Sequence, residues 1–126
     1  MDIETVFVPV DGSSRSSHAV EVAVAIAERY GGGIHALYLL DHDEESHTEE
    51  MMVATQMAAG DVHVGHSSAY GFDTSMLAHH PGSVILDASD DVGADFIVIP
   101  RQRPSDLLGK AASYVLQYAE QPVLSL

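Results

Sequence analysis

The chain has 126 residues, no cysteine, and 19 aspartates and glutamates against five lysines and arginines, which give a formal net charge of −14. Its length corresponds to one domain with its own hydrophobic core, so we expect a single domain at residues 1–126. The absence of cysteine excludes disulfides and thiolate metal sites, and so acidic a surface would repel nucleic acids and anionic membranes.

The first part of the chain predicts a strand, a helix and a second strand. An apolar, β-branched run at residues 3–10 is typical of a central parallel strand covered on both faces. Residues 14–30 place apolar side chains at helical spacing, after a serine-rich turn and before three glycines, and so predict a helix. Residues 34–40 predict a strand. We interpret the acidic stretch at 41–50 as a solvated loop and helix start, because it lacks the spacing of a calcium loop.

Residues 47–70 carry two conflicting patterns. Apolar or small residues from Met51 to Ala69 recur every three or four positions, as in a helix, whereas the segment DVHVGH alternates like a strand. We favour one helix over residues 47–70, weakened at Gly60 and Gly65.

The second part of the chain continues the alternation of strands and helices. We predict a strand at 72–79, a helix from Pro81 to Val92, a strand at 95–100, a helix at 109–120 and a last strand at 122–126. An alternating β-α order of this kind implies an open parallel sheet with right-handed crossovers and helices on both faces.

Four of the five basic residues fall in two segments that each follow a predicted strand. They are Arg15, Arg101, Arg103 and Lys110. Ligands of open parallel sheets bind at the carboxyl ends of the strands, with anionic groups near helix N-termini, so this cluster predicts an anion site. Two alternatives stay open. The side chains could pair with acids such as Asp11 and Asp106, or they could hold counter-ions without a biological role.

Both ends of the chain resemble the universal stress protein family. The opening VFVPVDGSSRSSHAVEVAVAIA is similar to that family's first strand, Asp-Gly-Ser turn and first helix. The closing segments GADFIVIPRQR and LLGKAASYVLQYAEQPVLSL are similar to its fourth strand, nucleotide loop, last helix and dimerising strand. The resemblance implies an adenine nucleotide alpha hydrolase-like fold, with a five-stranded sheet of order 3-2-1-4-5.

The loop after the fourth strand departs from the ATP-binding members of that family. Those members carry G-x2-G-x9-G-[ST], whereas this chain has Pro100 and Arg103 at the first two glycine positions, Gly109 at the third and Lys110 at the hydroxyl position. Glycines let backbone amides approach phosphates, and proline has no amide to offer. We therefore expect ATP to bind weakly or not at all, with phosphate or another anion held by the basic side chains instead.

The cluster and the resemblance together define a candidate binding site. It consists of Asp11, Gly12, Ser13, Arg15, Leu39, Arg101, Arg103, Gly109 and Lys110. The resemblance implies that Asp11 contacts the nucleoside and that the backbone of Leu39 meets adenine. Asp11 has a second interpretation, in which it holds the turn and balances Arg15. For Ser13 and its neighbours Ser14 and Ser16 we favour helix capping over phosphate binding.

The sequence shows no catalytic or metal-binding pattern. No serine lies in a G-x-S-x-G turn, and no His-Glu pair has metalloprotease spacing. The histidines nearest to a metal pattern are His63, His66, His79 and His80. A helix would place His63 and His66 on one face, but adjacent residues of a strand point to opposite faces, so we interpret these histidines as surface residues without a metal.

The resemblance implies a regulatory protein linked to stress, and the lack of a catalytic pattern favours one without enzymatic activity. We expect it to be cytoplasmic. The N-terminus lacks the basic region of a signal peptide, and no apolar run is long enough to span a membrane. The resemblance implies a homodimer formed through the strand at residues 122–126, acting on an unknown regulated protein. The alternative is an ATP-binding switch with at most slow hydrolysis. A third interpretation, a hydrolase of similar topology, is disfavoured because this sequence lacks the catalytic residues that a hydrolase needs.

The acidic composition predicts that salt stabilises the protein. With a single lysine among its 126 residues, the chain resembles proteins of salt-loving organisms, and we interpret it as haloarchaeal. Fourteen uncompensated negative charges repel one another more in the compact state than in the expanded one, and salt screens this repulsion. Molar KCl should therefore raise the midpoint of thermal unfolding, and a midpoint that falls steadily with salt would contradict this.

Overall fold

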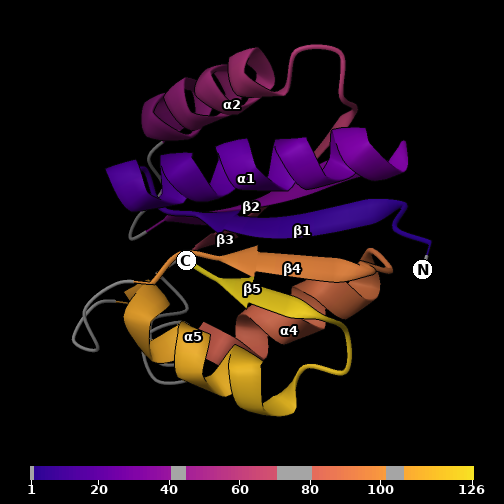
Figure 1. Ribbon diagram of the computed structural model, residues 1–126. Helices are drawn as coiled ribbons and strands as arrows, with labels where there is room; N and C mark the ends of the chain where they lie inside the picture. Colours follow the sequence, from indigo (N-terminus) through magenta and orange to yellow (C-terminus); the bar gives the residue numbers. More distant parts are fainter. Residues whose placement is uncertain (1, 41–44, 71–80, 102–106) are drawn as a thin grey trace.

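The computed structural model describes residues 2–40, 45–70, 81–101 and 107–126, which form a parallel sheet between two layers of helices (Figure 1). The elements are β1 (Thr5–Val10), α1 (Ser14–Tyr30), β2 (Gly33–Leu40), α2 (Glu45–Ala59), β3 (Val64–Tyr70), α4 (Pro81–Asp91), β4 (Phe96–Ile99), α5 (Leu107–Tyr118) and β5 (Val123–Ser125). The strand order is β3-β2-β1-β4-β5, and every neighbouring pair is parallel. The predicted sheet and its order are confirmed.

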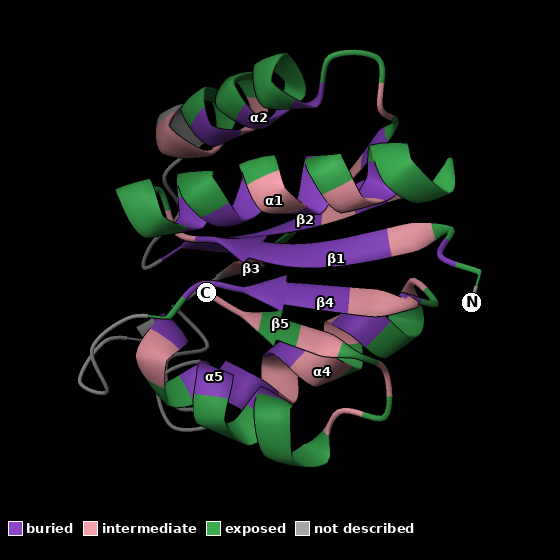
Figure 2. Cartoon of the chain, viewed as in Figure 1, coloured by how far each residue is buried: buried purple, intermediate pink, exposed green. Residues whose placement is uncertain are grey.

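The two faces of the sheet bury separate hydrophobic cores. Side chains of a strand alternate between faces, so Val6 and Val8 pack beneath α1 and α2, whereas Phe7 packs beneath α4 and α5. These three side chains have no exposed surface, and Figure 2 shows β1 buried along most of its length. A continuous apolar run suits this strand because helices cover both of its faces.

Helix α1 has the bounds that the sequence predicts. Ser13 caps its start, because its hydroxyl oxygen accepts a hydrogen bond from the Ser16 amide at 3.2 Å. The buried Ser16 hydroxyl donates in turn to the Ser13 carbonyl at 3.0 Å. At the other end, Gly31 has a φ of 71°, in the left-handed region that glycine adopts without strain, and ends the helix. The capping interpretation of these serines is confirmed.

The single helix predicted over residues 47–70 is wrong. Helix α2 ends at Ala59, Gly60 turns the chain with a φ of 58°, and β3 begins at Val64. The alternation of DVHVGH was the correct signal. Strand β3 lies at the edge of the sheet and pairs with β2 alone in the described residues, so it contains small and polar residues that a central strand would not.

The third strand of the sheet is therefore β3, and not the strand predicted at residues 72–79, which lies outside the described residues. The later elements confirm their predictions with small shifts. Helix α4 begins at Pro81 as expected, whereas α5 begins two residues earlier than predicted and β5 covers only the middle of the predicted last strand. Among the described residues, no helix is long and apolar enough to cross a membrane.

Candidate functional site

The fold brings two of the basic residues together at the carboxyl ends of β1 and β4. The guanidinium group of Arg15, in the first turn of α1, donates a hydrogen bond to the backbone carbonyl of Arg101, which follows β4. Both side chains line a pocket of about 210 Å³. Its other lining residues are Ser14, His18, Pro100 and Leu126. This arrangement places a cationic pocket where the sequence predicted that the two segments meet.

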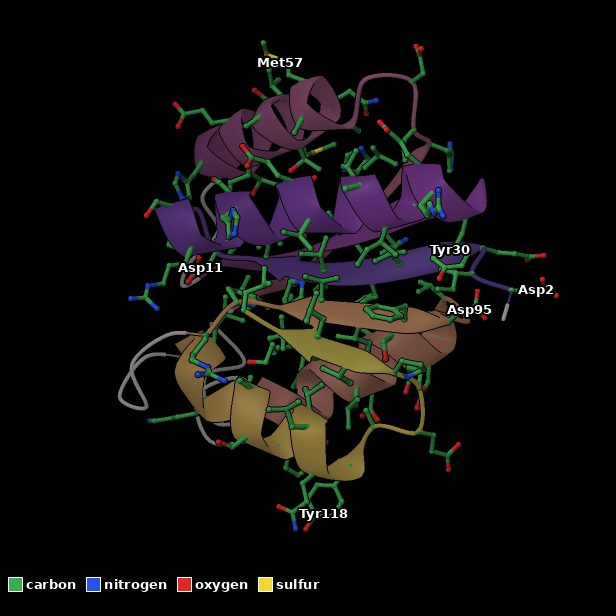
Figure 3. The ribbon with its side chains drawn as sticks, viewed as in Figure 1. Asp2, Asp11, Tyr30, Met57, Asp95 and Tyr118 are labelled. Carbon is green, nitrogen blue, oxygen red and sulfur yellow. The ribbon has the colours of Figure 1, made fainter. Side chains whose placement is uncertain are left out.

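The turn after β1 is held by Asp11. One of its carboxylate oxygens accepts hydrogen bonds from the Ser13 amide at 3.0 Å and the Ser13 hydroxyl at 2.6 Å. Gly12 between them has a φ of 85°, which disfavours any residue with a Cβ. Figure 3 shows Asp11 at this turn, beside the start of α1. Of the two interpretations of Asp11, the structure directly supports the one in which it holds the turn.

The backbone amides at the end of β4 are not open to a ligand. Pro100 has no N–H group and is buried. The N–H group of Arg101 donates to the Leu126 carbonyl at 2.6 Å, and the Leu126 N–H group donates to the Ile99 carbonyl at 3.0 Å. These bonds extend the pairing of β4 with β5 beyond the strand ends. The ATP-binding pattern begins with a glycine whose amide can face phosphate. At that position this chain has Pro100, and the next amide, that of Arg101, is bonded to Leu126.

The other predicted site residues are more dispersed. The side chain of Leu39 is 5% exposed and packs in the core beneath α4 and α5, so it contributes to packing and does not face a ligand. Gly109 and the exposed Lys110 lie in the first turns of α5, outside the lining of the Arg15 pocket. Arg103 lies outside the described residues. His18 is a lining residue that the sequence analysis missed, although its position three residues after Arg15 on a helix indicates a shared face.

Two histidines lie in the sheet and hydrogen-bond to neighbouring side chains. His66 lies in β3 and its Nδ1 atom is 2.7 Å from the Tyr38 hydroxyl, whereas His35 in β2 hydrogen-bonds the Ser67 hydroxyl at 2.9 Å and stacks on Phe7. The helical face expected for His63 and His66 does not exist, because His63 directly precedes β3 and His66 lies within it. His79 and His80 lie outside the described residues, and the described residues contain no group of three or more histidines and carboxylates that could hold a metal ion.

The five-stranded parallel sheet between two layers of helices defines a doubly wound α/β protein. Comparison with known proteins gives the family. The model of the Universal stress protein family matches residues 2–126, so the chain belongs to this family. No curated protein matches the sequence.

Solved structures of the family share this fold at low sequence identity. The universal stress protein UspA from Lactobacillus plantarum has a TM-score of 0.80 and 22% identity, and the match covers 100% of this chain and 99% of that one. A universal stress protein in complex with cAMP has a TM-score of 0.76 and 21% identity, with 100% and 98% covered. The protein from Archaeoglobus fulgidus in complex with dAMP has a TM-score of 0.69 and 20% identity, with 99% and 98% covered.

The sheet histidines predict a loss of stability below neutral pH. Burial lowers the pKa of His35, as does the nearby His66 ring, and burial together with His63 lowers the pKa of His66. An ordinary histidine has a pKa of about 6.5, so in mildly acidic solution the unfolded chain binds protons that the folded protein does not. Stability is therefore full above about pH 6.5 and falls as the pH drops through the lowered pKa values.

This dependence can be measured by urea unfolding at pH 7.5 and pH 5.5 at one ionic strength, a range in which ordinary carboxylates stay ionised. The midpoint should be lower at pH 5.5. The variant His35→Gln, which keeps a polar group beside Ser67, should show a smaller difference between the two pH values than the parent chain. An equal difference in both proteins would show that His35 does not contribute.

Proposed function

We propose that this protein is a non-catalytic, homodimeric regulator of the stress response that binds ATP weakly or not at all. The observation that carries the proposal is the end of β4, where Pro100 lacks an amide and the Arg101 amide is bonded to Leu126. A triphosphate needs several convergent N–H donors, because its charges must be stabilised as they leave water. The described part of the loop supplies none at these two positions.

The hydroxyl groups near the switch point also support a role without catalysis. Ser13 and Ser16 are engaged in capping α1, and the Asp11 carboxylate is bonded to Ser13. A nucleophile needs a base within hydrogen-bond reach and room for a substrate, whereas these groups are committed to the turn. We also propose that the protein works in the cytoplasm, as expected from its sequence.

A second candidate is a switch that responds to an adenine nucleotide with one phosphate. Two of the structures with this fold are complexes with cAMP and dAMP, which each carry a single phosphate group. The pocket beside Arg15 and Arg101 offers cationic side chains, and one phosphate needs fewer donors than three. This observation favours a monophosphate or an inorganic anion over ATP at this site.

The proposal predicts that ATP does not stabilise the protein. A ligand at one hundred times its dissociation constant adds about 2.7 kcal/mol to the stability of the protein that binds it. Thermal melts with and without millimolar Mg-ATP, at equal ionic strength, should superimpose. A shift of several degrees would contradict the proposal.

The same melts distinguish the two candidates when inorganic phosphate and AMP are added. A rise in midpoint with AMP that is absent with ATP would support the monophosphate switch. The variant Arg15→Ala is the control, because it removes a guanidinium group from the pocket while leaving the Ser13 cap in place. A rise that persists in this variant would place the anion elsewhere.

The edge of the sheet supports the homodimer. Strand β5 pairs with β4 on one side, and its other side is unpaired in the described chain (Figure 1). Leu124 is 37% exposed on this edge, and the neighbouring helix α5 exposes Leu116 and Tyr118. An uncovered apolar edge is a template for pairing with a second chain, and a two-fold axis there would bring Leu124 against its own copy.

A charge placed on this edge should dissociate the dimer. We predict that Leu124→Glu weakens self-association at least tenfold, because two carboxylates would face each other across the axis. Sedimentation over a range of concentrations measures the effect. Met57→Glu is the matched control, because Met57 is 79% exposed on α2 and far from β5 in the fold (Figure 3). A parent chain that stays monomeric at all concentrations, or equal effects of both variants, would contradict the predicted interface.

A further inference from the structure

A second pocket, of opposite character, lies between α1 and α2. Its volume is about 290 Å³, close to the lower end of the range for small-molecule sites. The lining residues are Val10, Gly12, Ser17, Val20, Glu21, His47, Glu50, Met51, Ala54, Thr55 and Ala58. None of the residues predicted for the anion site except Gly12 belongs to it. The two pockets lie on different sides of α1, since α2 contributes to one and the end of β4 to the other.

The pocket exists because small side chains face each other across the two helices. Helix α2 buries Met51, Thr55 and Ala59, which hold it against the sheet and α1. Ala54 and Ala58, one turn apart, and Ser17 on α1 are too short to fill the space between the helices. At the end of the pocket near β1, the His47 ring lies against Gly12. A Cβ added at Gly12 would be 3.0 Å from the His47 Nε2 atom.

The interior of the pocket is apolar and its rim is acidic. Val10, Val20 and Met51 are buried and form apolar wall surface, and the buried Thr55 hydroxyl is engaged with Tyr38. Glu21 and Glu50 line the pocket from opposite helices, and their side chains are 71% and 80% exposed. Among the described residues, the ion-pair partner of each carboxylate is a histidine 3.8 Å away, which carries a positive charge only when it is protonated. No lysine or arginine is among the described residues that line the pocket.

We propose that the pocket between α1 and α2 binds a small organic cation with an apolar body and an ammonium group. The apolar body would displace water from the walls formed by Val20, Met51 and Ala54. The ammonium group would lie at the rim between Glu21 and Glu50, in the field of a protein with a formal net charge of −14. The negative charge of the protein and of the two glutamates disfavours phosphates and carboxylates at this pocket. Its ligands would therefore be cations, whereas the basic residues of the Arg15 pocket favour anions.

The charge selectivity can be tested with three probes of equal length. They are n-hexylammonium, hexanol and hexanoate, titrated by calorimetry or by amide chemical shifts at pH 8 and constant ionic strength. Hexylammonium should bind with a dissociation constant of about 0.1–1 mM, as expected for a ligand of its size. Hexanol should bind more weakly, and hexanoate should not bind. No binding of hexylammonium at 20 mM, or equal binding of hexanoate, would overturn the proposal.

Three variants locate the binding site. Ala54→Leu places a larger side chain in the pocket from an exposed helix position and should abolish binding, with a thermal melt to show that the variant folds. Glu50→Gln should weaken binding about two- to fivefold, the size of effect expected for an exposed carboxylate. Glu49→Gln is the matched control, because it makes the same change of charge on α2 outside the pocket lining. Undiminished binding in Ala54→Leu, or equal effects of the two glutamine variants, would overturn the assignment.

Discussion

The fold depends on the burial of β1 between two parallel neighbours and two layers of helices. β1 pairs with β2 on one side and β4 on the other, and Val6, Phe7 and Val8 have no exposed surface. A strand in this position must be apolar on both faces, because it has no solvent-facing side. The chain leaves β1 in one direction to build β2 and β3 and returns on the other side of β1 as β4. The strand order therefore reverses at β1. The candidate anion site lies at this point, beside the carboxyl end of β1.

Helix α1 separates two pockets of opposite charge. Arg15 and His18 face the end of β4, whereas Ser17, Val20 and Glu21 face α2. Successive residues of a helix are rotated by about 100° around its axis, so Arg15 and Ser17, two positions apart, point to different sides of α1. His18 and Glu21 lie at the boundary between the two pockets, where their side chains are 3.8 Å apart. In a protein as acidic as this one, the basic pocket is the exception and the acidic pocket follows the general composition.

The end of β4 keeps its place in the fold while offering few free backbone donors. Strand β4 and helix α5 are in place, yet Pro100 has no N–H group and the N–H group of Arg101 is bonded to Leu126. The cost to the fold is small, because Pro100 follows the last residue of β4 and removes no bond within the strand. Fold and ligand chemistry are separable here, since the first depends on buried apolar strands and the second on a few donors at their ends.

The sequence by itself determined the elements whose signals are local. Helix α1 could be predicted at both ends because its cap at Ser13 and its stop at Gly31 are made by the residues themselves, and the apolar run of β1 required a central position in the sheet. The meeting of Arg15 with the segment at Arg101 also followed, since the carboxyl ends of parallel strands lie at one edge. Only the tertiary structure decided where the helix predicted over residues 47–70 ends. Spacing suited both a helix and a strand in the second half of this segment, and pairing with β2 selected the strand at Val64–Tyr70. The pocket beneath α2 was equally beyond the sequence, because its existence depends on how far apart two helices with small facing residues pack, and that distance is set by Met51, Thr55 and the sheet below them.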